Sequence, residues 1–451
     1  MMFGADRRME AGTYLAAGFA TRQAIAAKLE GWVALHEIAN VSQPNRLKGI
    51  LVDSDYGVPF LAATQVFDIE PTPRKWLSRN KTPNIQSFYV EQGTILLTRS
   101  GTVGRSIVSQ KKHENVIISD DLLRIRLTNP NDKGWLFAYL RSPSVMAMLQ
   151  SAHYGHVIKH LEVSHVNALP VVTISDELKS KFCEDVASIV DMREEADRLV
   201  ASFRKMLSDR FHLDQIEVKG VHHSTASLSA LAGRRRRFEA SYHSYRAQSL
   251  VQALALNSVK MDRLGDVTER VWWMTRFSRN FGDTGVPYMS SDDLFSLSQP
   301  ETKKIFTDPI PNYSDFFVKQ GWLLMACSGQ TYGLNGSVTL ATKHDESFFF
   351  THDLIRISPN SDRIRSGYLY AFLSHPDIGQ LLAKRAAYGS SIPHIDPTDV
   401  EEIPLARLPH DIENNIADMA ERASQLRADA AELERETVSR AEAIINAFLS
   451  R

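Results

Sequence analysis

The chain contains 451 residues, of which 43% are hydrophobic and 23% are charged, and its formal net charge is −1. This length is too great for one core and predicts two domains of about 200 residues or several smaller ones. The composition is that of a soluble globular protein, because no apolar run approaches the roughly 20 residues of a membrane span.

The N-terminus and the cysteines bear on location. The opening MMFGADRRMEAGTYL carries charges where a signal peptide needs a continuous apolar run. The two cysteines, Cys183 and Cys327, lie too far apart to form a metal-ligand spacing. A reducing cytoplasm is therefore the expected location. The net charge by itself gives no sign of a nucleic-acid partner.

A first unit is predicted over residues 7–172. Runs such as TILLT and VIIS lie between turn-forming residues and predict short strands, whereas WLFAYLRSPSVMAMLQ predicts a helical segment. Residues 173–213 follow as a long helix with apolar residues at heptad spacing, interrupted by Arg193. The seam consists of Phe182, Val186, Ile189, Ala196, Val200, Phe203 and Leu207.

After a polar linker over residues 214–235, a second unit over residues 236–406 repeats the first. Six phrases recur in the same order: RRMEA and RRFEA, GVPFLAATQVF and GVPYMSSDDLF, GTILLTRSG and GWLLMACSG, SDDLLRIRL and THDLIRISP, GWLFAYLRSP and GYLYAFLSHP, and YGHVIKH and YGSSIPH. Such a repeat dictates the architecture, so two similar α/β units are expected.

A second long helix is predicted over residues 407–451. Its seam runs through Ile416, Met419, Ala423, Leu426, Ala430 and Leu433. Two heptad seams in one chain pack most economically on each other. The predicted fold class is α+β, with two tandem α/β domains whose helices pair as an antiparallel coiled coil with pseudo-twofold symmetry.

Two glycine-bearing turns are the first candidate binding sites. TRSGTVGR carries Arg99, Ser100, Thr102 and Arg105, and arginines of this kind bind phosphate or guanine. The corresponding turn CSGQTYGLNG carries Ser328, Gln330, Tyr332 and Asn335, and Gln or Asn pairs with adenine. An ordinary strand-capping turn is the alternative interpretation of both.

Three further stretches complete the candidate site. RKWLSRNK and WWMTRFSR mix basic and aromatic residues, as nucleic-acid faces do, and the repeated YG phrases add polar residues. His160 and His394, which recur in those phrases, are more plausibly structural. The additional candidates for DNA contact are Arg74, Lys75, Arg79, Lys81, Arg276, Arg279, Lys159, Ser390 and Ser391.

The duplicated order of G-x-ILL-T-R-S-G, YG-x-x-I-x-H and RR-x-EA phrases, with two heptad tails, resembles the specificity subunit of type I restriction–modification enzymes. The resemblance implies two target recognition domains, each reading half of a split DNA sequence, and helices that act as a spacer. It also implies no catalysis in this chain. The implied partners are double-stranded DNA, two methyltransferase subunits that use S-adenosylmethionine, and the motor-nuclease subunits of a restricting complex.

Two other classes stay open. A nuclease would need acidic metal ligands, for which Asp209, Glu217 and Lys219 are the nearest candidates. An assembly or inhibitory module of a phage-defence methylation complex would keep the repeat without reading DNA. Otherwise no catalytic or metal-binding motif is present, because phosphate-loop, H-E-x-x-H, G-x-S-x-G and Asn-Pro-Pro-Tyr phrases are all missing.

Overall fold

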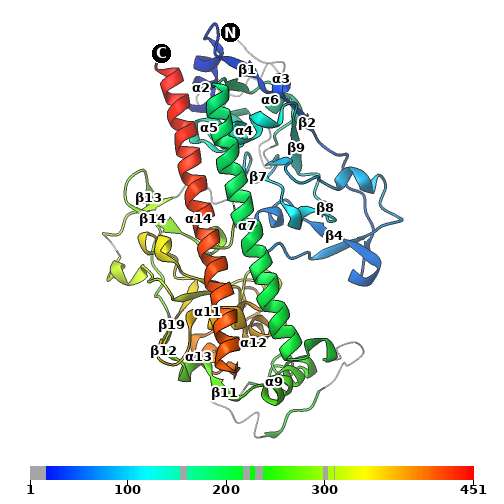
Figure 1. The fold of residues 1–451 in the computed structure, drawn as a ribbon, viewed down its shortest axis with the longest axis vertical. Helices are drawn as coiled ribbons and strands as arrows, with labels where there is room; N and C mark the ends of the chain where they lie inside the picture. Colours follow the sequence, from blue (N-terminus) through cyan, green and yellow to red (C-terminus); the bar gives the residue numbers. More distant parts are fainter. Residues whose placement is uncertain (1–16, 153–159, 217–223, 229–236, 298–302, 309) are drawn as a thin grey trace. The chain divides into compact units, whose positions relative to one another are not determined.

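The computed structural model describes residues 17–152, 160–216, 224–228, 237–297, 303–308 and 310–451 (Figure 1). The chain divides into two compact units. Unit 1 takes the described residues of Met1–Glu194, Ser296–Glu301 and Asp429–Arg451, and unit 2 takes those of Glu195–Phe295 and Thr302–Ala428. None of the described helices has the length and apolar character needed to cross a bilayer.

The described residues of unit 1 form three small sheets. They have the orders β1-β10, β2-β9-β6-β7 and β3-β5-β4-β8. Among the described strands, every pairing is antiparallel except that of β4 with β8. The strands are β1 (Trp32–Ala34), β2 (Ala39–Ser42), β3 (Leu51–Val52), β4 (Gly57–Leu61), β5 (Lys75–Ser78), β6 (Ile95–Thr98), β7 (Ser106–Val108), β8 (Ile117–Ile118), β9 (Leu122–Leu127) and β10 (Pro170–Val172).

Unit 2 repeats the same three orders, as β11-β20, β12-β19-β16-β17 and β13-β15-β14-β18. The one parallel pairing among its described strands, that of β14 with β18, is at the same place in the third sheet. The strands are β11 (Lys260–Arg263), β12 (Thr268–Trp273), β13 (Phe281–Gly282), β14 (Val286–Met289), β15 (Lys304–Ile305), β16 (Leu323–Ala326), β17 (Val338–Leu340), β18 (Phe349–Phe350), β19 (Leu354–Pro359) and β20 (Pro404–Arg407). The sequence repeat therefore corresponds to a repeated topology.

Short helices connect and cover these strands. In unit 1 they are α2 (Ala17–Ala26), α3 (Leu35–Ile38), α4 (Lys133–Arg141), α5 (Pro143–Ala152) and α6 (Val163–Asn167). In unit 2 they are α9 (Tyr245–Asn257), α10 (Ser291–Leu294), α11 (Ser366–Ser374), α12 (Gly379–Lys384) and α13 (Pro397–Glu401). The 3-10 turns are η1 (Ser54–Tyr56), η2 (Gln65–Phe67), η3 (Ile85–Phe88), η4 (Lys111–His113), η5 (Pro130–Asp132), η6 (Leu213–Gln215), η7 (Leu264–Asp266), η8 (Tyr313–Phe316) and η9 (Lys343–Ser347).

The core of each unit is built around one apolar helix, α4 or α11. In α4, Trp135 is buried and its indole Nε1 donates to Val172 O at 2.8 Å. In α11, Tyr368 is buried and its hydroxyl donates to Ala406 O at 2.5 Å. Trp and Tyr bury a large apolar ring only when the polar end finds a partner, and both repeats provide one at the same place.

The long helices α7 (Asp176–Arg210) and α14 (His410–Leu449) each contribute residues to both units (Figure 1). The seven apolar positions predicted for the α7 seam are all buried. Phe182 and Val186 of α7 share the unit 1 core with Ala441 and Ile445 of α14. This packing explains why each long helix is divided between the two compact units. From the sequence, the helices 173–213 and 407–451 were expected to be separate from the domains 7–172 and 236–406.

Within unit 1, the ion pairs between α7 and α14 show that the two helices run in opposite directions. Asp185 pairs with Arg440, and further along α7, Arg193 pairs with Glu434 at 2.9 Å. The α14 seam also departs from the expected one. Leu433 is only half-buried, and Glu434 is buried beside it. Glu434 can occupy the seam because Arg141, at 2.6 Å, and Arg193 both neutralise it.

Candidate nucleic-acid interface

The turns at Ser100 and Ser328 have the same backbone scaffold. Ser100 forms an isolated antiparallel β-bridge with His160, and Ser328 forms one with His394. The residue before each serine accepts a bond from the residue after each histidine, as Leu161 N donates to Arg99 O at 2.8 Å and Ile395 N to Cys327 O at 2.9 Å. The repeated histidine therefore marks the second strand of a small pairing, in agreement with its structural interpretation.

In the first turn, the arginines are engaged by the protein. The Arg99 guanidinium bonds Glu162 Oε1 at 2.9 Å, and its side chain is 14% exposed. The Arg105 guanidinium lies 4.4 Å from the centre of the Phe67 ring and donates to Ser296 Oγ at 3.0 Å. Ser100 is half-buried and Thr102 is exposed. Contact of Arg105 with phosphate would require breaking these interactions, so its position is better explained by unit 1 packing.

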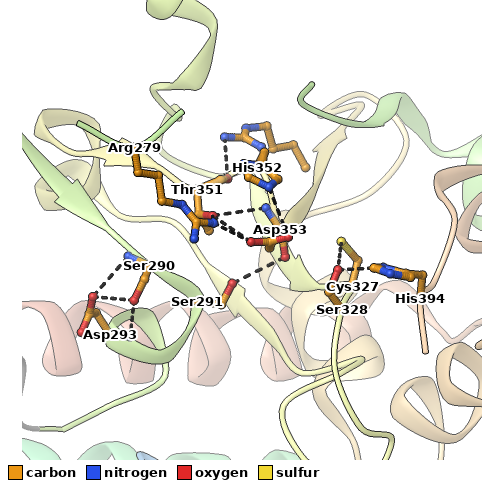
Figure 2. Close-up of polar contacts among 11 residues, drawn as sticks. Arg279, Ser290, Ser291, Asp293, Cys327, Ser328, Thr351, His352, Asp353 and His394 are labelled. Atoms are coloured by element: carbon orange, nitrogen blue, oxygen red, sulfur yellow. Dashed lines mark hydrogen bonds and ion pairs between the residues drawn. The ribbon is translucent and has the colours of Figure 1, made fainter. Parts of the chain in front are cut away.

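In the second turn, Asn335 and Ser328 form hydrogen bonds inside the loop, and the other predicted residues lie on its exposed rim. Asn335 is fully buried, and its amide nitrogen donates to Gly329 O at 2.9 Å and to Pro393 O at 3.0 Å. That nitrogen is consequently committed to the loop rather than to a base. Ser328 Oγ lies 2.9 Å from His394 Nδ1, also inside the turn (Figure 2).

The exposed rim of the second turn consists of four predicted residues. Gln330 Nε2 donates to Ser391 O at 2.8 Å and so ties together the two loops that carry them. Tyr332 is 66% exposed, and Ser390 and Ser391 are exposed beside Ile392. The corresponding first-unit candidate Lys159 lies outside the described residues.

Basic residues gather on the third sheet of each unit. In unit 1, the four predicted residues Arg74, Lys75, Arg79 and Lys81 are all exposed on or beside β5. Arg46 and Lys48, which precede β3, are also exposed and were not expected from the sequence. β3 pairs with β5, so these residues enlarge the same basic area.

The third sheet of unit 2 has a similar composition. Arg276 is exposed before β13, and Lys303 and Lys304 are exposed on or beside β15. The lysines were also missed. Leu51 pairs with Leu77, and Phe281 pairs with Ile305, so Leu51 and Phe281 are at equivalent positions of the two repeats. Arg46 and Arg276 each lie five residues before these positions. Aligning the two repeats at these positions would have identified Arg46 from the predicted Arg276.

Apolar side chains are exposed among these basic residues. Leu51 is 59% exposed in unit 1, and Phe281 and Phe306 are 43% and 42% exposed in unit 2. The Lys303 amine lies 5.6 Å from the centre of the Phe281 ring. Cationic side chains bind phosphate, and apolar or aromatic ones contact sugars and bases, so this mixture suits a nucleic-acid surface.

Arg279 is held by an acidic turn (Figure 2). Its guanidinium donates to Asp353 Oδ2 at 2.8 Å and to Thr351 Oγ1 at 3.1 Å. The adjacent His352 has a lowered pKa because it is partly removed from water, which favours its neutral form. Arg279 is therefore positioned by unit 2, with 40% of its side chain still exposed.

The cysteine of the second turn is not an activated nucleophile. Burial raises the pKa of the Cys327 thiol to about 11, so it stays protonated at neutral pH. Its sulfur lies 3.9 Å from Ser328 Oγ, and that oxygen lies 2.9 Å from His394 Nδ1. The described residues contain no group of three or more metal-ligating side chains. Of the nuclease candidates, Asp209 pairs with Lys205 at 2.6 Å, and Glu217 and Lys219 lie outside the described residues.

No protein-family model and no curated protein matches this chain. Solved structures resemble it along most of its length. The type I restriction-modification S subunit from M. genitalium is 12% identical with a TM-score of 0.32, over 94% of this chain and 96% of that one. The HsdS subunit from Thermoanaerobacter tengcongensis is 15% identical with a TM-score of 0.28, over 93% and 95%. A chain from a structure of type I R-M complex assembly is 14% identical with a TM-score of 0.29, over 93% of this chain and 96% of that one.

Proposed function

We propose that this chain is the DNA specificity subunit of a type I restriction–modification system. Each unit reads one half of a split DNA target. One observation carries the proposal: the same strand order and the same Ser–His bridge occur twice, while the side chains around the two turns differ. A shared scaffold with different exposed residues is what two different half-sites require.

The long helices serve as the spacer between the two reading surfaces. In this proposal α7 and α14 pair as an antiparallel coiled coil with pseudo-twofold symmetry. The 40 residues of α14 extend about 60 Å at ~1.5 Å per residue. Half-sites on one face of a duplex are separated by about 34–36 Å or a multiple of it, so a helix of this length is sufficient.

Catalysis then belongs to partner subunits. Two methyltransferase subunits bind this chain and supply S-adenosylmethionine chemistry, and a restricting complex adds motor-nuclease subunits. The protonated Cys327 thiol supports a non-catalytic role. In this arrangement the chain contributes binding energy and base discrimination, and the partner contributes methyl transfer.

A second candidate function is an assembly or inhibitory module without its own DNA readout. The formal net charge of −1 favours it, because DNA-binding proteins generally neutralise phosphates with excess Lys and Arg. Salt-dependent binding of a random duplex by the methyltransferase complex supports the DNA-reading function and opposes this alternative.

Methylation-sensitive sequencing of host DNA, with this gene present and with it deleted, tests the proposal. We expect a methylated two-part sequence that disappears on deletion and returns on complementation. Identical methylation in the two strains, while the partner methyltransferase is produced in both, would contradict a specificity function.

A further inference from the structure

A buried arginine occurs at the same place in each unit. Arg124 is 2% exposed on β9, and Arg356 is fully buried on β19. The two positions are equivalent, because Arg124 is paired with Leu96 of β6 and Arg356 with Leu324 of β16. Two copies of a diverged repeat thus keep the same buried cation.

These arginines bond to backbone carbonyls. Arg124 Nη1 donates to Leu122 O at 2.9 Å, and Nη2 donates to Ile118 O at 3.1 Å. Arg356 donates to Leu354 O at 3.2 Å, to Phe316 O at 3.3 Å and to Thr351 O at 3.4 Å. Neither forms an ion pair within the described part of the chain.

Burial lowers the pKa of each guanidinium to about 10, so both stay charged at neutral pH. A buried cation without a carboxylate is costly, and an apolar residue would fill the same core volume without that cost. The position of the carbonyls that these arginines bind therefore indicates what the buried charge does. In unit 1 they lie on both sides of the short turn after β8, residues 119–121. In unit 2, Thr351 O lies within the equivalent turn after β18, residues 351–353, Leu354 O directly follows it, and Phe316 O belongs to η8.

In both units this turn joins the two parts of the candidate interface. In unit 1, Asp121 O accepts from Arg99 N at 3.1 Å, and Asp120 O accepts from Gln43 Nε2, before β3, at 3.2 Å. In unit 2, Asp353 O accepts from Cys327 N, and the Asp353 carboxylate binds Arg279, before β13 (Figure 2). A displacement of the turn would move both parts together.

We propose that Arg124 and Arg356 are positioning residues for DNA reading, each fixing the turn that aligns the two DNA-contacting segments of its own unit. The inference rests on the proposed function and deepens it. Arginine suits this task because its planar fork binds several carbonyls at once, whereas a lysine amine keeps the charge without the fork geometry. Each arginine should then affect one half-site only.

The test uses the full chain in complex with its methyltransferase subunits. Initial methylation rates are measured on the cognate duplex and on duplexes with one mismatch in either half-site. We expect Arg356→Lys to lower the cognate-to-mismatch ratio about tenfold in the half read by unit 2, within the range for a weakened base contact, and to leave the other half unchanged. Arg124→Lys should give the reverse pattern, so each variant is the control for the other.

The ratio is insensitive to the fraction of folded complex, so lower stability alone does not produce the expected pattern. Equal loss of discrimination in both halves, or no loss in either, would overturn the positioning role. If Arg356→Lys kept full activity and Arg356→Met reduced the salt slope, the arginine would act through its long-range charge on DNA. This result would also overturn the positioning role. A wild-type complex without any sequence preference would remove the proposed function itself.

Discussion

Arginine side chains around the candidate interface have two different environments. Arg105 and Arg99 contact groups of unit 1, and Arg279 contacts Asp353 and Thr351. Arg276 instead is exposed, beside the exposed lysines of β15. The sequence identified these residues as basic and close to turns, but a guanidinium that binds a hydroxyl or a carboxylate has the same local sequence as one that binds phosphate. Only packing distinguishes them.

Arg276→Ala should remove one phosphate contact. Each neutralised phosphate contributes about 0.9 to the magnitude of the slope of log K against log salt concentration, so we expect the slope to decrease by about that amount on every duplex. Arg198→Ala on α7, which removes an exposed arginine paired with Glu195, is the matched control and should leave the slope unchanged. The same slope in Arg276→Ala and wild type would show that this residue faces away from DNA.

Gln330→Ala should act on sequence preference rather than on salt dependence. Gln330 is exposed on the rim of the second turn, and a glutamine amide has the donor and acceptor that pair with an adenine edge. Binding measured on singly mismatched duplexes should lose about 1–3 kcal/mol of discrimination at one base pair. Discrimination that is undiminished at every position would assign Gln330 to loop support through Ser391 alone.

His375 makes the stability of unit 2 depend on pH. Burial lowers its pKa from 6.5 to about 4, and its Nε2 lies 3.0 Å from Ser208 Oγ of α7. The unfolded chain binds the proton more tightly, so the stabilisation is fully present above about pH 6.5 and is lost as the pH falls toward 4. Between about pH 7.5 and 5 this amounts to about 2 kcal/mol.

Urea unfolding of wild type and His375→Gln at these two pH values measures the effect. The variant should lose about 2 kcal/mol less stability on acidification, because glutamine does not titrate in this range. His410→Gln, at the exposed start of α14, is the control. An equal pH dependence in wild type and His375→Gln would contradict the assignment.

At the scale of elements, heptad spacing predicted the buried face of α7 residue by residue, because each apolar side chain there simply packs. The α14 seam was predicted less well. Glu434 is charged, and its burial depends on Arg141 and Arg193, which lie far away in the sequence. The insertion of Leu297 into the unit 1 core, where its nitrogen donates to Phe67 O at 2.7 Å, likewise has no local signal.

Glu434→Ala should strongly destabilise unit 1, because it leaves two buried arginines without their carboxylate. We expect a loss of about 3–5 kcal/mol in the free energy of unfolding. Glu195→Ala, which breaks only an exposed ion pair on α7, should cost about 0–1 kcal/mol. Chemical unfolding of both variants measures the difference, and equal values would mean that the Arg141–Glu434–Arg193 cluster contributes no more than a surface pair.

At the scale of the whole molecule, the duplication was the most predictable feature. Within the described residues, the repeated phrases correspond to strands, turns and the apolar helix of both units, because these positions carry turn residues and core residues that a common fold requires. The RRMEA phrase and most of YGHVIKH lie outside the described residues. The exposed basic residues of the third sheets were predicted only in part, since solvated positions such as Arg46 and Lys303 follow no periodicity. A fold constrains its interior far more than its surface.

The central claim is that each unit reads one half of a DNA target independently. The most direct measurement exchanges residues 285–404 for the corresponding segment of a relative with a different target, and then determines the methylated sequence of host DNA. Our account predicts a new sequence in one half, with the other half unchanged, because the remaining unit keeps its own turn and basic sheet. A change in both halves, or in neither half while methylation continues, would contradict modular reading by two units.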